Sequence, residues 1–302
     1  MKFKTIISIL LCFFYVISIK CTNPVFDYED DEDYYADYHI PDIDSHDLDN
    51  VKDGIGLIKI TLDSSELTYL LKNSFKQGSE WKRRCTVSVT IGTDTFTRIC
   101  DLKIHGGISR GYHKKSFRLY FKDQSIFSDE IFKNFPNRHN LSNKFSELVL
   151  NANCMDLSNI RNYLSMYISS RLGAVTPRIG FTRLVINGKY FGLYSVIERV
   201  NQNMVKKLLK HSNFDLLKSC SHDGNLKTVN DFNNKRKHDP TKGFELKHGN
   251  WKLLKEFEFW LESDKYSYEV LSSRLPKSAL LGFNLGYFYC GVSDSYSKNY
   301  YI

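Results

Sequence analysis

Apolar runs of the length that a membrane span requires are missing from this sequence after its first twenty residues. A spanning helix needs about 20 predominantly apolar residues. One shorter run, Ile6 to Ile19, follows Lys2 and Lys4 and ends at Lys20 and Cys21. A basic start before an apolar stretch of this size is typical of a secretory signal peptide. We therefore predict a cleaved signal at residues 1–21 and an exported, secreted or cell-surface protein without a stable membrane span after cleavage. A retained anchor is the alternative.

Closely spaced cysteine pairs are also missing, although the chain has seven cysteines. Structural zinc sites use such pairs, so we expect no zinc site. Cys12 and Cys21 belong to the predicted signal, which leaves an odd number: Cys85, Cys100, Cys154, Cys220 and Cys290. Cys85 and Cys100 flank a predicted hairpin, so they can face each other as a disulfide in an oxidising compartment. Buried free thiols are the alternative.

Lysine and arginine are missing between Asp27 and Asp49, a stretch that holds eleven acidic residues. Such composition favours disorder, and we predict an acidic disordered segment over residues 22–55. The rest of the chain is then more basic than the overall net charge of +8 indicates. A basic body suits anionic ligands or acidic partner proteins. No basic cluster accompanies a stacking-aromatic motif, so nucleic acid is not an expected partner.

Two kinds of periodicity organise the remainder. Alternation of apolar and polar residues predicts strands over 57–62, 85–91, 95–105 and 116–122. Asn187-Gly188 joins two further alternating runs, 181–186 and 190–197, as a tight hairpin. Helical spacing predicts helices at 64–72, 157–172, 201–209, 251–261, 268–275 and 278–290. The pattern indicates an α+β protein with a mostly antiparallel sheet, an inserted helix and a largely helical second part.

Four segments, read in order, resemble the CotH family, which is named for bacterial spore-coat proteins. They are residues 103–119 (KIHGGISR followed by KKSFRL), residues 148–162 (LVLNAN followed by D-L-S-x-I-R-N), residues 185–200 (VINGKYFGLYSVIERV) and residues 294–302 (DSYSKNYYI). The segment Asp215-Leu-Leu-Lys218 also resembles the family, and the likeness extends over most of Ile58–Ile302.

The resemblance implies a secreted atypical protein kinase. Its fold would be a sheet-rich small lobe over residues 56–200 and an incomplete, mainly helical large lobe over 201–302. It would transfer phosphate from ATP, with Mg or Mn, to Ser or Thr of secreted or coat proteins. Phosphoryl transfer needs cations on the phosphates, a carboxylate that accepts the hydroxyl proton, and metal ligands.

The cationic groups come from lysines in this reading. Lys114 is at the family's position for the phosphate-contacting lysine, with Lys115 as its rival, and Lys218 is a further cation. A solvated lysine pair at a strand edge is the alternative for Lys114 and Lys115. The segment His105-Gly-Gly-Ile-Ser-Arg-Gly can bring backbone N–H groups to phosphates, although glycines at a hairpin bend explain it equally.

The carboxylate and metal ligand come from the final segment. Asp294 and Asn299 have the D-x-x-x-x-N spacing of the protein-kinase catalytic loop, where aspartate is the base and asparagine a metal ligand. A turn-forming Asp-Ser is the alternative. Glu198 closes the hairpin where a kinase chain crosses between its lobes. It can bind the adenine or ribose of a nucleotide, or it can pair with Arg199 or Lys206.

Two family features are missing. The predicted helix 157–172 has no acidic residue to pair with a small-lobe lysine, and Asp156 at its start is the nearest substitute. The family's W-D-x-D segment, which supplies the main magnesium ligand, does not occur among the 302 residues. We therefore expect a truncated and inactive kinase as one outcome. An adhesin that binds a surface receptor, or a structural coat protein without catalysis, is the other.

Overall fold

The computed structural model describes residue 48, residues 53–126, 129–136, 141–156, 158–219 and 243–262, and isolated positions between 269 and 285. The predicted signal peptide, nearly all of the acidic segment and most of the chain after residue 262 lie outside the described residues. None of the helices in the described part combines the length and apolarity that a membrane span requires.

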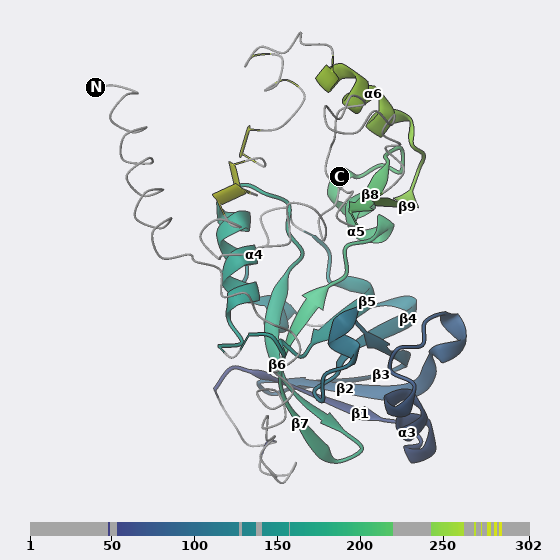
Figure 1. The fold of residues 1–302 in the computed structure, drawn as a ribbon. Coiled ribbons are helices and arrows are strands. Elements are labelled where there is room, and N and C mark those ends of the chain that lie inside the picture. The colour runs from purple at the N-terminus through teal and green to yellow at the C-terminus, as the bar shows by residue number, and fades with distance from the viewer. Residues whose placement is uncertain are drawn as a thin grey trace, which may run out of the picture. The chain divides into compact units, whose positions relative to one another are not determined.

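Seven strands form a closed barrel in the order β1-β2-β3-β4-β5-β7-β6 (Figure 1). Neighbouring strands are antiparallel except β1 and β6, whose parallel pairing closes the barrel. The sheet-rich first part is confirmed and is consistent with an α+β protein, whereas the two kinase lobes stay a prediction. The strands are β1 (Gly56–Thr61), β2 (Arg83–Ile91), β3 (Asp94–His105), β4 (Ser116–Ile126), β5 (Lys144–Asn151), β6 (Ile179–Ile186) and β7 (Lys189–Glu198).

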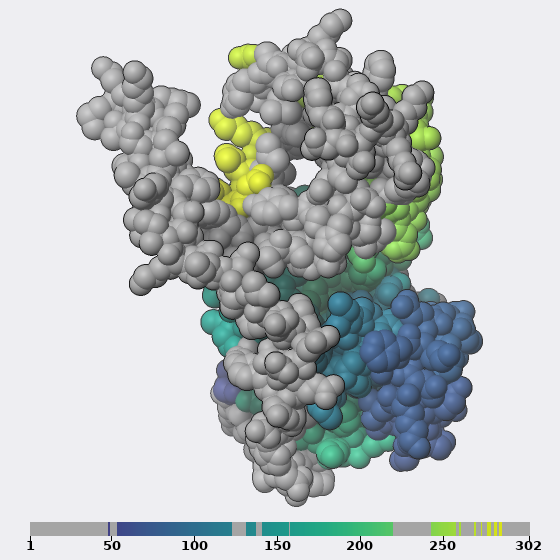
Figure 2. Space-filling view, in the orientation of Figure 1, coloured from purple at the N-terminus to yellow at the C-terminus, as the bar shows by residue number. Residues whose placement is uncertain are grey.

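Alternation along the strands separates the barrel interior from its outer face. On β4, Phe117 and Leu119 are fully buried in the main core, while Arg118 and Tyr120 between and after them are partly exposed. Successive side chains of a strand point to opposite faces, so the same strand supplies both surfaces. In Figure 2 the blue residues, which belong to the early strands and the helix that follows β1, lie together on one side of the visible face.

The predicted Asn187-Gly188 hairpin is confirmed between β6 and β7. Both residues have positive φ, 50° and 80°, as a primed turn requires. Asn187 also fastens the turn to the end of β1, because its backbone N–H donates to Ile60 and its side-chain oxygen accepts from the Leu62 N–H at 2.9 Å. The turn therefore fixes the parallel pairing that closes the barrel.

The helices are α3 (Ser64–Lys72), α4 (Arg161–Arg171), α5 (Gln202–Leu209) and α6 (Lys252–Glu262). Asp63 caps α3 and Asn201 caps α5, each accepting from two backbone N–H groups of the first turn. α4 covers the outer face of the barrel, where its Tyr163, Met166 and Tyr167 pack against a cluster formed by Phe135, Val149, Ile179 and Ile197.

The region after β7 contains a strand pair that the sequence did not predict. β8 (Leu216–Ser219) and β9 (Phe244–His248) form a separate two-stranded antiparallel sheet, between α5 and α6. The expectation of a largely helical second part is therefore corrected for these residues. Four-residue β8 is too short to show a period, and its partner lies far along the chain.

A buried ion pair ties together the ends of β5, β6 and β7. Arg178 precedes β6 and Glu198 ends β7, and both side chains are 3% exposed. The Arg178 Nε and Nη2 donate to the two Glu198 carboxylate oxygens at 2.9 and 3.1 Å. Its remaining donors bond Leu141 and Ser142 carbonyls and the Asn143 side chain, just before β5. All five guanidinium N–H groups therefore have acceptors.

We predict that Glu198→Gln destabilises the barrel by about 3–5 kcal/mol, because it leaves the Arg178 charge buried without its counterion. Chemical denaturation monitored by circular dichroism measures the free energy of unfolding. The matched control is Glu256→Gln, which breaks the exposed Lys252–Glu256 pair of α6 and should cost about 0.5 kcal/mol or less. Equal effects of the two changes would contradict the structural role of the buried pair.

Candidate functional site

The glycine-bearing segment between β3 and β4 is folded around a buried arginine. Gly106 has φ 115°, a backbone conformation that residues with a Cβ rarely adopt, so the segment favours glycine at this position. Arg110 is buried and donates to the Gly106 carbonyl at 2.5 Å and to the Lys76 carbonyl at 3.0 Å. The tip of the segment carries Ile108, whose side chain is 84% exposed.

Lys114, the first candidate for phosphate contact, is buried, with only 5% of the residue exposed. Its ammonium donates to the Leu193 carbonyl at 2.6 Å and lies 4.8 Å from the centre of the Tyr194 ring. Burial lowers the pKa of Lys114 to about 8. Gly192 leaves room for the side chain, because a Cβ there would lie 3.3 Å from the lysine Cε.

Lys115, the rival candidate, has a different partner. Its ammonium donates to the Arg110 carbonyl at 2.7 Å, and its own carbonyl accepts from the Tyr194 hydroxyl at 2.8 Å. Burial lowers the pKa of Lys115 as well. Both lysines thus bond to backbone carbonyls of the barrel and its glycine segment, and a role in phosphate binding stays a prediction for each.

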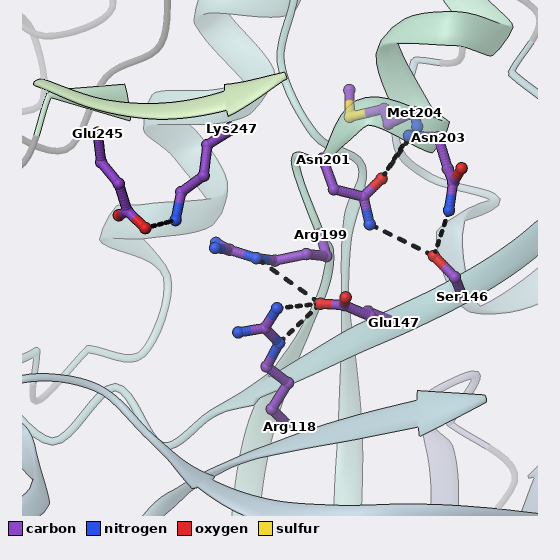
Figure 3. A network of polar contacts seen from close by, with 9 residues as sticks. All are labelled: Arg118, Ser146, Glu147, Arg199, Asn201, Asn203, Met204, Glu245 and Lys247. Atoms are coloured by element: carbon purple, nitrogen blue, oxygen red, sulfur yellow. Dashed lines mark hydrogen bonds and ion pairs between the residues drawn. The ribbon is translucent and has the colours of Figure 1, made fainter. Parts of the chain in front are cut away.

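The outer face of the barrel carries the arrangement that best suits an anion. Arg118 of β4 donates from Nε to the Glu147 carboxylate of β5 at 2.8 Å and also contacts it through Nη2. Arg199, directly after β7, places its Nε 3.9 Å from the same oxygen. Figure 3 shows both guanidinium groups directed at the single carboxylate of Glu147. The two guanidinium groups and the one carboxylate together carry a net charge of +1.

Arg199 has hydrogen-bonding capacity to spare. Its Nε is buried and has no hydrogen-bond partner, since 3.9 Å to Glu147 is too long for one. A buried unpaired donor costs roughly 1–3 kcal/mol. An anionic oxygen beside Arg199 would remove that cost.

Two further lysines and a histidine lie near this arginine pair. Lys103 and His105 lie on the outward side of β3, and Lys218 lies on β8 opposite Glu245. Burial, followed by the charges of Arg199, Arg118, Arg110 and Lys218, lowers the pKa of His105 to about 3. The imidazole is therefore neutral at physiological pH. We call Lys103, His105, Arg118, Arg199 and Lys218 the cationic face.

Among the sequence-predicted residues, Lys218 is the one that the structure brings into the cationic face. Glu198 instead pairs with Arg178, which is neither of the two basic partners considered for it, and a role in nucleotide binding stays a prediction. Sequence reasoning missed Arg118, Glu147 and Arg199 as a group. The alternation of β4, with Phe117 and Leu119 inward, was the signal that Arg118 faces outward.

Asp156, the substitute acidic residue before the predicted helix, serves the backbone. One carboxylate oxygen accepts from the N–H of Ser158 at 3.1 Å and from its hydroxyl at 2.5 Å, and the other accepts from the Arg161 N–H at 2.8 Å. These bonds satisfy the amides that precede and begin α4. The Asp156 carboxylate thus accepts hydrogen bonds at the start of α4.

The predicted base Asp294 and metal ligand Asn299 lie outside the described residues. Within the described ranges, no group of three or more His, Cys, Asp and Glu side chains is suited to hold a metal ion. Gly282, which precedes Asp294, lies close to the end of α4: a Cβ there would lie 2.8 Å from the Ser169 carbonyl oxygen and 2.7 Å from the Ala174 backbone nitrogen. Gly282 therefore permits close contact between this segment and the helix.

Comparisons with known proteins agree with the segments identified in the sequence. The family model described as CotH kinase protein matches residues 102–302. The chain is similar to the inner spore coat protein H of Bacillus subtilis (strain 168), with 26% identity over 162 residues, which are 54% of this chain and 39% of that protein. The chain thus matches well under two thirds of this relative.

The matched region contains most of the barrel and the whole cationic face, from Lys103 on β3 to Lys218 on β8. It also includes the glycine-bearing segment between β3 and β4, the Asn187-Gly188 hairpin, and Asp294 with Asn299. Because the family model covers more than half of the chain, this protein belongs to the CotH family.

Proposed function

We propose that this protein is an exported CotH-type protein kinase that binds ATP at the cationic face and phosphorylates Ser or Thr of coat or cell-surface proteins. One observation carries the proposal: Arg118 and Arg199 converge on Glu147, and the Arg199 Nε is buried without a hydrogen-bond partner. Arginine offers planar, paired N–H donors that suit phosphate oxygens.

The cationic face suits a phosphate chain better than Lys114 does. The Lys114 ammonium is committed to the Leu193 carbonyl, so a phosphate would have to displace that contact. Arg199 has an unused buried donor, and Lys218 adds a charge from a different sheet. A phosphate that contacts both the barrel arginines and Lys218 would be held between the two sheets.

The reaction needs two further groups from this chain, besides the main magnesium ligand of the W-D-x-D segment, which does not occur among the 302 residues. Asp294 would accept the proton of the substrate hydroxyl, and Asn299 would hold a divalent metal, as their resemblance to the kinase catalytic loop implies. Bound ATP supplies the phosphoryl group, and Mg or Mn neutralises charge on its phosphates. Arg118 and Arg199 would orient the phosphates and stabilise the charge that develops on them.

The substrates that we propose follow from the relative. The similar Bacillus protein is named as an inner spore coat protein, which supports coat or surface proteins as partners. The predicted signal peptide supports export. An adhesin that binds a surface receptor, or a structural coat component, requires no nucleotide, so nucleotide binding separates these functions from the kinase.

We predict that Arg118→Met and Arg199→Met each raise the Kd for MgATP by about 10–100-fold, since a hydrogen bond to a charged group contributes roughly 1.5–3 kcal/mol. Isothermal titration calorimetry measures the Kd, and melting curves verify that each variant is folded.

The matched control is Arg84→Met. Arg84 is an exposed arginine of β2 whose partner is Asp101 on β3, and its loss should change the Kd by less than about 2-fold because exposed ion pairs contribute little. Wild-type affinity in folded Arg118→Met and Arg199→Met would remove the cationic face as the nucleotide site. A wild-type protein that does not bind MgATP at all would favour the adhesin or structural function.

We predict that Asp294→Asn, in the full-length protein, lowers the rate of phosphate transfer by about 10²–10⁴-fold, because the amide cannot accept the hydroxyl proton. The Kd for MgATP should stay within about 2-fold of the wild-type value, as the cationic face is unchanged. Transfer of radiolabelled γ-phosphate to protein measures the rate.

Asp94→Asn, at the exposed β2–β3 turn, serves as the control and should retain the wild-type rate. Undiminished transfer by Asp294→Asn would reject Asp294 as the base while leaving the nucleotide site intact. Equal loss in both variants would point to a defect of folding.

A further inference from the structure

Two cysteines face each other inside the barrel. Cys85 of β2 is directly opposite Cys100 of β3 in the antiparallel register. Their sulfur atoms are 3.4 Å apart, and the side chains are 4% and 0% exposed. Each is a free thiol in this structure. The sequence left a disulfide and a pair of free thiols as alternatives, and the geometry now allows a choice.

We propose that Cys85 and Cys100 form a disulfide that joins β2 to β3 within the barrel core. Residues directly opposite in an antiparallel pair have Cα atoms about 4.5–5.5 Å apart, within the range that disulfides span. The sulfur atoms need to move closer by about 1.4 Å to reach the S–S bond length of about 2.0 Å. Rotation about the two Cα–Cβ bonds provides such movement without a change of strand register.

The oxidant is a low-molecular-weight or protein disulfide, such as oxidised glutathione. A thiolate of one cysteine attacks the oxidant, whose S–S bond breaks and releases one thiol. The second cysteine then attacks the mixed disulfide, the Cys85–Cys100 bond forms and a second thiol leaves. Two S–H protons and two electrons pass from the cysteines to the oxidant. The proposed kinase activity plays no part, and export matters only because it supplies an oxidising compartment.

The burial of the pair determines when the bond forms. The hydrogen bond with Cys85 and desolvation by burial raise the pKa of the Cys100 thiol, so the reactive thiolate is disfavoured in the folded barrel. An oxidant also cannot reach a side chain with no exposed surface. The disulfide is therefore expected to form while the β2–β3 hairpin exists but the barrel has not closed, and then to resist reductants once buried.

The disulfide would strengthen a hairpin that also positions the cationic face. Lys103 and His105 lie on β3, three and five residues beyond Cys100, and point outward while the cysteines point inward. Linking β2 to β3 fixes the register of these outward groups relative to the rest of the barrel. The bond would thus stabilise the core of the barrel. Because β3 also carries Lys103 and His105, the bond would hold these residues of the cationic face in position.

Peptide mapping tests the proposal directly. The full chain is refolded with oxidised glutathione, alkylated in denaturant with iodoacetamide and digested with trypsin without reduction. We expect the tryptic peptides Cys85–Arg98 and Ile99–Lys103 as one linked species, lighter by two hydrogens than the sum of the two reduced peptides. Full alkylation of both cysteines, or linkage of either one to another cysteine, would overturn the proposal.

Melting curves test whether the disulfide stabilises the protein. The oxidised protein is compared with the same protein reduced in denaturant and refolded with dithiothreitol. We expect the melting temperature to fall by about 5–10 °C on reduction, since a disulfide closing a loop of this length stabilises substantially. The Cys154→Ala variant should show the same fall, whereas Cys85→Ala/Cys100→Ala should show none. Equal melting temperatures of oxidised and reduced wild type would argue against a structural disulfide.

Discussion

The buried pair of Arg178 and Glu198 is the interaction on which the rest of the barrel depends. A guanidinium taken out of water is tolerable only when every donor finds an acceptor, and here all five do. Those acceptors come from the segment before β5 and from the end of β7, so one side chain aligns the ends of three strands. The backbone N–H of Glu198 also donates to the Arg178 carbonyl, which makes the alignment tighter still.

The position of Glu198 has a direct consequence for chemistry. The next residue, Arg199, points away from the barrel interior and towards Glu147 on β5. The inner pair and the outer pair thus involve successive residues of one chain segment, Glu198 and Arg199; the inner pair is buried and the outer pair is partly exposed. Any loosening of the inner pair would disturb the outer one, because both depend on how β7 ends beside β5.

For Lys114, the family resemblance and the structure supply different information. The resemblance identifies a residue by its neighbours in sequence, whereas the direction of its side chain depends on the glycine segment before β4 and on Gly192 across the barrel. In this fold the ammonium lies against Leu193 and Tyr194. A separate group of basic residues lies on the outer face, from β3, β4, β8 and the residue after β7.

The sequence by itself determined the features that depend on near neighbours. Alternation located β1, β2, β3 and β4, Asn187-Gly188 located the β6–β7 hairpin, and helical spacing located α3, α4, α5 and α6, whereas β5, β8 and β9 were not predicted. The family segments identified CotH. Only the tertiary structure decided which distant residues meet: Arg178 with Glu198, and Arg118 with Glu147. The physical reason is that period and turn chemistry act over a few residues, whereas these pairs arise from the register in which the barrel closes. That register is fixed by the packing of the whole core.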